Sequence, residues 1–196
     1  MTGINKSNFR TFDAVVIGAS AGGVNAITDI LAQTNRAVSF PIFIAKHVGL
    51  DDRGGAVTVF NKLTDLTIVE AWDKQVIEAG CVYIAPSNYH MLVENRKLLC
   101  LNTDEKACYV RPSIDVLFQS AADVYGERLL AIILTGANED GAEGVRSVAR
   151  GGGYTIAQQP QSAEVDVMPR AAIATGCVDQ IMTLGEISHF LNCLVA

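Results

Sequence analysis

Short apolar runs alternate along the chain with segments in which apolar residues recur every three to four positions. The apolar runs predict buried strands, and the helical period predicts amphipathic helices. The predicted strands are Ala14–Ile17, Ile42–Ala45, Leu66–Ala71, Val82–Ala85, Leu129–Leu134, Tyr154–Ala157 and Val178–Met182. The predicted helices are Val24–Leu31, Gly54–Lys62, Ile114–Val124, Ala142–Arg150, Pro169–Ala174 and Leu184–Leu194. This alternation predicts an α/β fold, a doubly wound and mostly parallel sheet with helices on both faces.

One segment departs from the alternation. The runs Met91–Glu94 and Lys97–Leu101 are joined at Asn95-Arg96, which predicts a β-hairpin inserted into the fold. No linker or internal repeat divides the rest of the chain. We therefore expect a flexible N-terminal lead over residues 1–12 and one domain over residues 13–196.

The composition excludes several classes of protein. A chain of 196 residues with 49% hydrophobic residues is expected to be globular. It has no apolar run near the roughly 20 residues of a membrane span and no signal-peptide pattern, so we expect a cytoplasmic protein without membrane insertion. A net charge of -6 argues against a nucleic-acid partner. The five cysteines are expected to be reduced and mostly buried, and no His/Cys cluster has metal-ligand spacing.

The turn after the first predicted strand carries the first chemical signal. The strand runs into Gly18-Ala19-Ser20-Ala21-Gly22-Gly23, and a helical pattern follows. This order predicts a strand, a tight turn and a helix N-terminus with one hydroxyl at the bend. The amide groups and dipole of a helix N-terminus favour negative charge beside that hydroxyl. The turn suits either a nucleophile that builds an oxyanion or a loop that holds a nucleotide phosphate.

Two known motifs of similar pattern fit poorly. An α/β-hydrolase elbow expects the chain order serine, acid, histidine, but here the serine follows the first strand and the only late histidine is His189. A dinucleotide fingerprint expects glycine in place of Ser20 and an acidic residue after the second strand, where Lys46-His47 stands. These mismatches favour a nucleophile outside the α/β-hydrolase pattern.

Four candidate residues for chemistry follow predicted strands. Sites in open α/β sheets form beyond the carboxyl ends of the strands, and Ser20, His47, His90 and Asp140 all lie there. Serine is a weak nucleophile near neutral pH. An imidazole can take its proton, and a carboxylate can fix the imidazole tautomer and stabilise the imidazolium. The four residues therefore contain the parts of a serine hydrolase.

Each candidate also has a structural explanation. Ser20 could cap a helix, His47 could be a capping or surface residue, and Asp140 could be a turn residue or the cap of the helix that follows it. The residues alone do not choose between His47 and His90. The acidic candidates that compete with Asp140 are Glu139, Asp115 and Asp166.

Six segments occur in a specific order along the chain: Gly18–Gly23, Lys46-His47, Val82–Pro86 with His90, Arg111–Phe118, Ile133–Gly136 through Asp140-Gly141, and Met168-Pro169. Together they resemble the catalytic domain of the chemotaxis protein-glutamate methylesterase family, CheB, over about Phe12 to Val195. The resemblance implies that Ser20 is the nucleophile, His47 the general base and Asp140 its orienting carboxylate. It implies hydrolysis of glutamyl methyl esters on the cytoplasmic helices of chemoreceptors, with deamidation of receptor glutamines in many members. It implies no metal and no organic cofactor.

The surroundings of this triad follow from the same resemblance. The backbone amides of Ala21 and Ala137 are expected to hold the oxyanion, and Arg111 to steer an acidic receptor helix into the site or to form a surface salt bridge. Family members typically have threonine at Ala21, methionine at Ala137 and glycine at Ser87, so this chain departs from them beside the expected cleft. About a dozen residues precede the first strand, so a phosphorylatable receiver domain in the same chain is not expected. The alternatives are an esterase or amidase of the same fold with another substrate, and a signalling module without turnover.

Overall fold

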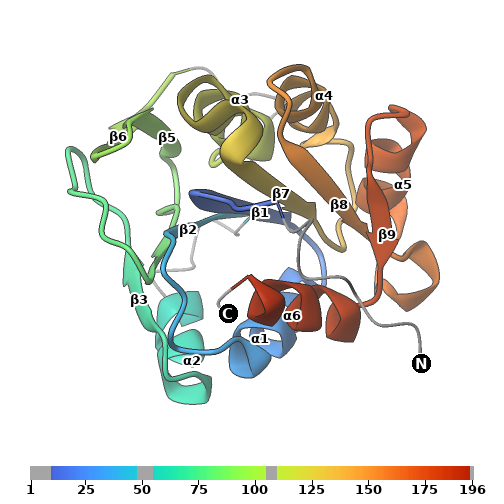
Figure 1. Ribbon diagram of the computed structural model, residues 1–196, viewed down its shortest axis with the longest axis horizontal. Helices are drawn as coiled ribbons and strands as arrows, with labels where there is room; N and C mark the ends of the chain where they lie inside the picture. Colours follow the sequence, from blue (N-terminus) through green and yellow to red (C-terminus); the bar gives the residue numbers. More distant parts are fainter. Residues whose placement is uncertain (1–9, 48–54, 105–109, 195–196) are drawn as a thin grey trace.

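A central parallel sheet organises the protein. The computed structural model describes residues 10–47, 55–104 and 110–194. Its parallel strands are β1 (Ala14–Ala19), β2 (Ile42–Lys46), β3 (Thr67–Glu70), β4 (Cys81–Ile84), β7 (Leu129–Ile133), β8 (Tyr154–Gln158) and β9 (Gln180–Met182). They form one seven-stranded sheet in the order β3-β4-β2-β1-β7-β8-β9 (Figure 1). Every pairing in this sheet is parallel.

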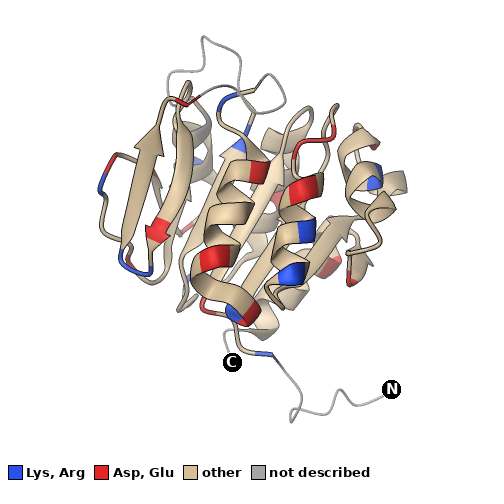
Figure 2. Cartoon of the chain, turned by 90° about the horizontal axis from the view of Figure 1, so that it is seen from above, with Lys and Arg blue, Asp and Glu red and all other residues tan. Residues whose placement is uncertain are grey.

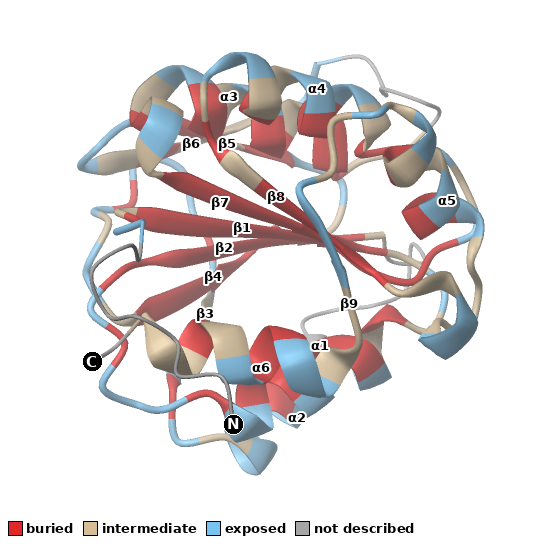
Figure 3. Ribbon diagram, turned by 45° about the vertical axis from the view of Figure 1, so that its right-hand side comes forward, coloured by how far each residue is buried: buried red, intermediate tan, exposed pale blue. Residues whose placement is uncertain are grey.

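Helices cover both faces of the sheet, which confirms the predicted fold class. The helices are α1 (Gly23–Gln33), α2 (Gly55–Leu63), α3 (Ile114–Tyr125), α4 (Ala142–Arg150), α5 (Val167–Ala174) and α6 (Leu184–Cys193). Helices α3, α4 and α5 lie on one face, and α1, α2 and α6 on the other (Figure 3). The predicted hairpin is also present, as the antiparallel pair β5 (His90–Asn95) and β6 (Leu98–Asn102). Predicted boundaries differ from the observed ones by at most two residues, and Gly54 lies outside the described residues.

The central strands are buried on both sides. Every residue of β1, β2 and β7 is buried, as expected where a parallel sheet is covered by helices and its strands are continuous apolar runs. Along β1, Val15 and Ile17 pack into the core on the side of α1 and α6. Ala14 and Val16 pack on the opposite side, with α3 and α4. The two cores fix the orientation of the strand and therefore the direction in which its carboxyl end emerges.

The strand order reverses next to β1. The chain places β2 on one side of β1, whereas β7 lies on the other side. In an open α/β sheet the loops that leave two such strands diverge and form a crevice beyond their carboxyl ends, where ligands bind. The loop after β1 begins at Ser20, and Asp140 lies in the loop between β7 and α4.

Helix α3 packs unusually close to this crevice. A Cβ atom at Gly18, near the end of β1, would lie 2.4 Å from Cγ2 of Ile114, the first residue of α3. A Cβ atom at Gly141 would lie 2.9 Å from the same Cγ2 atom, and Gly141 has a φ of 102° that side chains rarely adopt. The two glycines thus let the amino end of α3 contact both the end of β1 and the start of α4.

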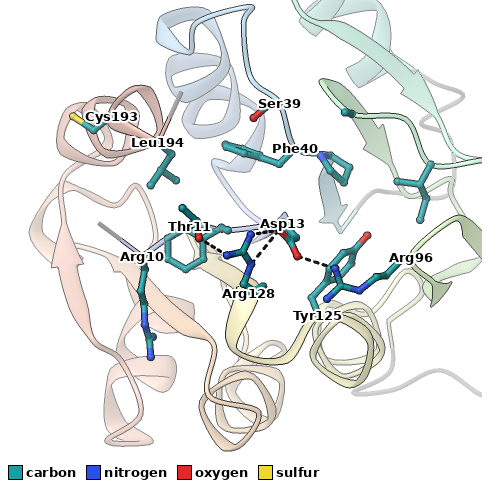
Figure 4. Close-up of a pocket in the computed structure, with 14 residues that line it drawn as sticks. Arg10, Thr11, Asp13, Ser39, Phe40, Arg96, Tyr125, Arg128, Cys193 and Leu194 are labelled. Carbon is teal, nitrogen blue, oxygen red and sulfur yellow. Dashed lines mark hydrogen bonds and ion pairs between the residues drawn. The ribbon is translucent and has the colours of Figure 1, made fainter. Parts of the chain in front are cut away.

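A separate cavity of about 940 Å³ lies at the amino ends of the central strands, opposite the crevice (Figure 4). Three of its charged groups pair with one another, since Asp13 lies 2.7 Å from Nη1 of Arg96 and 2.5 Å from Nη2 of Arg128. The hydrogen bonds from Arg128, with those from Arg96, hold the pKa of Asp13 below its usual range. Phe12, within the predicted lead, is buried against Tyr154 and Phe190. The part of the lead before Arg10 lies outside the described residues.

The two helices at the front of Figure 2 differ in charge. Helix α3 carries acidic residues and no basic ones, whereas α4 carries Glu143 near its start and Arg146 and Arg150 farther along. None of the described helices has both the length and the apolar character to cross a membrane. Cys81 is buried, but the other three described cysteines are partly exposed, so the expectation that most are buried is wrong. Cys108 lies outside the described residues.

Candidate active site

A tight turn presents the Ser20 hydroxyl at the bend between β1 and α1. The Ser20 amide donates a hydrogen bond to the Thr135 carbonyl at 2.9 Å, and the Gly23 amide donates to the Ser20 carbonyl at 2.8 Å. Gly22 caps α1 with a φ of 74°, a left-handed conformation that glycine adopts without steric cost. The strand, turn and helix predicted from the sequence are therefore present, and Ser20 is half-buried between them.

His47 joins Ser20 to Asp140. It follows β2, and its backbone amide donates to the carbonyl of Ala19 at 3.1 Å. Its Nδ1 atom lies 3.1 Å from Oγ of Ser20, and its Nε2 atom lies 2.7 Å from Oδ2 of Asp140. The His47 side chain is 10% exposed and that of Asp140 is fully buried. A continuous chain of hydrogen bonds thus runs from the serine hydroxyl to a buried carboxylate.

His90, the other histidine candidate, has a different environment. It is buried at the first position of β5, and its Nδ1 atom accepts a hydrogen bond from the backbone amide of Ser113 at 3.2 Å. The Ser113 hydroxyl donates instead to Asp140, at 2.9 Å from Oδ1. His90 therefore supports the start of α3, while His47 is the histidine placed between a hydroxyl and a carboxylate. His189 is exposed on α6.

Asp140 does not cap the helix that follows it. Helix α4 has Gly141 at its N-cap and no side-chain cap. The Asp140 carboxylate turns instead to the amino end of α3, where it accepts the backbone amides of Ile114 at 2.7 Å and Asp115 at 3.0 Å. Burial opposes its ionisation, but the hydrogen bonds from His47 and from these two amides prevail and lower the pKa of Asp140 below its usual range.

The acidic residues that competed with Asp140 in the sequence make other side-chain contacts or are exposed. Asp115 accepts the amides of Gly141 and Gly144 at the start of α4. Asp166 pairs with Arg170, and Glu139 is exposed. Among the contacts of the described residues, the carboxylate that reaches His47 is that of Asp140.

Two buried polar residues that the sequence analysis missed hold the serine turn in place. The Thr135 hydroxyl lies 2.8 Å from the carbonyl oxygen of Ala21, and the Thr135 amide donates to Oε1 of Gln158 at 2.8 Å. Both residues are at most 1% exposed. Their positions at the ends of β7 and β8 are the signal that could have identified them, because a polar residue that ends a buried apolar strand points to the crevice or to a hydrogen bond beneath it.

The two predicted oxyanion residues lie in different loops: Ala21 directly follows Ser20, and Ala137 lies between β7 and α4. Ala21 and Ala137 are both exposed, and within the described part of the chain neither backbone amide donates to a protein acceptor. Asn138, a further residue that the sequence analysis missed, places Nδ2 at 3.4 Å from Nδ1 of His47. The site therefore offers amide donors close to the hydroxyl.

Arg111 lies just before α3 and is only partly exposed. Its Nη1 atom donates to the carbonyl oxygens of Thr103 at 2.6 Å and Asp104 at 3.0 Å. The salt bridge considered from the sequence is not found among the described residues. The described residues also contain no group of three or more His, Cys, Asp or Glu side chains placed to hold a metal ion.

The geometry defines what the three residues can do together. With the Nε2 proton of neutral His47 donated to Asp140, Nδ1 is the ring nitrogen able to accept the proton of the Ser20 hydroxyl. An imidazole held in this way is a general base for a serine nucleophile. The nearby amide groups at a helix N-terminus can stabilise negative charge that develops on a carbonyl oxygen.

Comparison with known proteins identifies relatives over most of the chain. Residues 15–191 match the family described as CheB methylesterase. A candidate protein-glutamate methylesterase/protein-glutamine glutaminase of Leptospira interrogans is 42% identical, over 91% of this chain and 92% of its own length. Protein-glutamate methylesterase/protein-glutamine glutaminase 1 of Rhodospirillum rubrum is 34% identical over 91% of this chain. The chain covers only 48% of that longer relative.

A solved structure extends the similarity to three dimensions. The CheB methylesterase catalytic domain of Thermotoga maritima superposes with a TM-score of 0.89 at 30% sequence identity. The match covers 93% of this chain and 98% of that domain. The sequence segments, the sheet topology and these matches agree, and the chain belongs to the CheB methylesterase family.

Proposed function

We propose that this chain is a protein-glutamate methylesterase in which Ser20, His47 and Asp140 form the catalytic triad. The observation that carries the proposal is the unbroken hydrogen-bond chain from Ser20 through His47 to the buried Asp140, at 3.1 and 2.7 Å. Family membership supports the reaction type, and the names of the relatives in L. interrogans and R. rubrum support the substrate class, glutamyl methyl esters of a protein.

In the first half of the reaction Ser20 becomes acylated. Nδ1 of His47 takes the hydroxyl proton as Oγ of Ser20 attacks the ester carbonyl, and the Asp140 carboxylate stabilises the imidazolium that forms. The carbonyl oxygen becomes an oxyanion, and the free amides of Ala21 and Ala137 are the proposed donors to it. The imidazolium then returns its proton to the departing methoxide oxygen, and methanol leaves.

In the second half water replaces the acyl group. His47 takes a proton from water, the resulting hydroxide attacks the acyl-enzyme, and the proton passes to Oγ of Ser20 as the glutamate carboxylate is released. The same steps hydrolyse a glutamine side chain, with ammonia as the leaving group in place of methanol. The relatives named protein-glutamine glutaminases support this second activity.

The proposed partners are the methylated cytoplasmic helices of chemoreceptors. A cytoplasmic location of this chain is part of the same proposal. We include Arg111 as a candidate contact for an acidic segment of such a helix. Its guanidinium group is anchored by two carbonyl oxygens of the loop after β6, those of Thr103 and Asp104, rather than by a carboxylate. The positive charge is therefore not neutralised by an ion pair among the described residues.

Methanol release from methylated receptor tests the proposal directly. We expect Ser20→Ala to reduce turnover below detection, because removal of a triad nucleophile leaves only the contribution of binding and oxyanion stabilisation. Ser39→Ala is the matched control, since Ser39 lines the cavity at the amino ends of the strands, and this variant is expected to retain wild-type turnover. Circular dichroism of both variants checks the fold.

Three outcomes would contradict specific parts of the proposal. Full methanol release by Ser20→Ala would exclude Ser20 as nucleophile. Hydrolysis of a small ester by the wild type without methanol release from receptor would indicate a different substrate. A wild-type protein that neither hydrolyses esters nor reacts at Ser20 with a fluorophosphonate probe would indicate a binding module without turnover.

A further inference from the structure

The amino ends of α3 and α4 exchange carboxylates, so that the acid beside each helix start binds backbone amides at the start of the other helix. Asp140 precedes α4 but accepts the backbone amides of Ile114 and Asp115 in the first turn of α3. Asp115 belongs to that turn of α3 but accepts the amides of Gly141 and Gly144 at the start of α4, at 2.9 and 2.6 Å. Each helix therefore supplies the acid that binds the unpaired amides of the other.

This exchange has a cost in desolvation free energy, because both carboxylates are withdrawn from water. Asp115 is 8% exposed and Asp140 is fully buried. Burial, together with the charge of Asp140 and a hydrogen bond to its side chain, raises the pKa of Asp115 to about 6 against the opposing effect of the Gly144 and Gly141 amides. Capping alone does not need a second buried charge at this place, since a neutral serine or asparagine caps a helix as well.

The other ionisable groups around Asp115 lie farther away, along the hydrogen bonds of Asp140 and Ser113 or at the surface. From β2, His47 contacts the far side of Asp140. From β5, His90 binds the amide of Ser113, two residues before Asp115. From α4, Glu143 pairs with Arg146 at the exposed surface. The charge that faces Asp115 directly is that of Asp140.

We propose that Asp115 is a positioning residue for the catalytic triad, which ties the loop that carries Asp140 to α3 and adds its negative charge to that of Asp140 behind His47. This inference rests on the proposed role of Ser20, His47 and Asp140. It assigns to Asp115 an effect on the reaction through Asp140, without contact with the substrate.

Two physical effects follow from this position. The bond to Asp115 fixes the Gly141 amide, which belongs to the residue directly after Asp140, so its loss frees the Asp140 loop to move away from His47. Misplacement of a catalytic group by about 1 Å can reduce the rate by a factor of about 100. In addition, the Asp115 charge stabilises the imidazolium form of His47, because opposite charges attract strongly where solvent is excluded.

The rate of Ser20 labelling by a fluorophosphonate probe, measured from pH 5 to 9, tests the proposal independently of the natural substrate. In Asp115→Asn the remaining amide oxygen can still accept both α4 amides, but the charge is lost. We expect this variant to keep its fold and to move the acid limb of the profile to lower pH by about half a unit to one unit. Asp115→Ala also loses the hydrogen bonds, and we expect its labelling rate to fall at least about tenfold. Asp123→Asn, an exposed substitution on the same helix, is the control and should match the wild type.

The outcomes separate this proposal from the function on which it rests. Failure of the wild type to label would overturn the triad itself. A wild type that labels, with an acid limb that is the same in Asp115→Asn and Asp123→Asn, would reduce Asp115 to a structural cap and overturn the proposal. Should Asp115→Ala fail to fold, the Asp115→Asn profile alone decides.

Discussion

Asp140 keeps its charge in a fully buried position because its surroundings supply hydrogen bonds in place of water. Nε2 of His47, the Ser113 hydroxyl and the amides of Ile114 and Asp115 all bind its two oxygens. Hydrogen bonds to an ionised group are stronger than neutral ones, and together they offset the cost of desolvation. The carboxylate is thereby rigid as well as charged, which holds His47 in one orientation.

Substitutions at His47 and at His90 should have sharply different effects on ester hydrolysis. We expect His47→Asn to reduce ester hydrolysis by about a thousandfold or more, because the general base is lost. We expect His90→Asn to stay within about threefold of the wild type, since the asparagine oxygen can replace Nδ1 as acceptor for the Ser113 amide. Steady-state kinetics on one ester substrate compare the two variants.

A second substitution at His90 measures its structural contribution. His90→Leu leaves the buried Ser113 amide without its acceptor, which should lower the free energy of unfolding by about 1–3 kcal/mol in urea titrations. If His90→Asn were as inactive as His47→Asn, the assignment of the base to His47 would have to be abandoned.

At the residue scale, the sequence led to four candidate residues for the site but could not choose among them. Ser20, His47, His90 and Asp140 all follow strands, and position after a strand is what the sequence reveals. The choice depends on neighbours in the sheet: β2 lies beside β1, whereas β4 lies one strand farther away. Asp115 was an acidic competitor of Asp140 in the sequence, and only the contacts between the amino ends of α3 and α4 separate its role from that of Asp140.

At the scale of elements, the contact between β1 and α3 determines how closely the first turn of α3 approaches Asp140. Ile114 packs where a side chain on Gly18 would stand, so the first turn of α3 approaches close enough for its amides to bind Asp140. The precision of the triad therefore depends on a glycine inside a strand, a position where glycine otherwise weakens the sheet.

Gly18→Ala tests this dependence. The new Cβ atom would lie 2.4 Å from Cγ2 of Ile114, and we expect α3 to shift and the free energy of unfolding to fall by about 1–3 kcal/mol. The double variant with Ile114→Ala removes the clashing atoms and should lose less than the sum of the two single changes. Gly185→Ala, where a Cβ atom meets nothing within 4 Å, is the control and should be neutral or slightly stabilising. Chemical denaturation of the four proteins measures the coupling, and strict additivity would contradict the steric explanation.

The elements themselves were predictable, because apolar runs and helical periods are local properties of the sequence. Their order in the sheet was not. The strand β3 lies at the edge and β4, which follows it in the chain, lies inside it. Alternation of strands and helices fixes parallel pairing and handedness, but it leaves open which neighbour each new strand selects.

At the scale of the whole molecule, the two crossed acids make stability depend on pH in opposite directions. The pKa of Asp140 is lowered on folding, so its contribution to stability is present above the unfolded value of 3.8 and is lost as the pH falls below it. The pKa of Asp115 is raised from 3.8 to about 6, so the folded state binds its proton more tightly. The contribution of Asp115 is therefore present at low pH and is lost as the pH rises from about 4 to above 6.

Asp115→Asn removes the pH dependence of stability that comes from Asp115 and leaves the one that comes from Asp140. We expect the stability of this variant relative to the wild type to increase between pH 4.5 and pH 7.5, by at most about 3 kcal/mol from a shift of about two pKa units. Urea unfolding of both proteins at the two pH values gives the comparison, and any constant structural effect of the substitution cancels between them. A difference that is independent of pH would show that Asp115 titrates normally in the folded protein.

The position of β7 next to β1 determines when the proposed site can assemble during translation. Ser20 and His47 leave the ribosome within the first quarter of the chain, but Asp140 follows only after the hairpin and α3. The nascent chain carries the proposed nucleophile and base with no carboxylate to orient them until β7 takes its place on the open side of the central strand. The same insertion completes the buried centre of the sheet and the proposed triad, so we expect a chain that ends before β7 to hydrolyse esters far more slowly than the full chain.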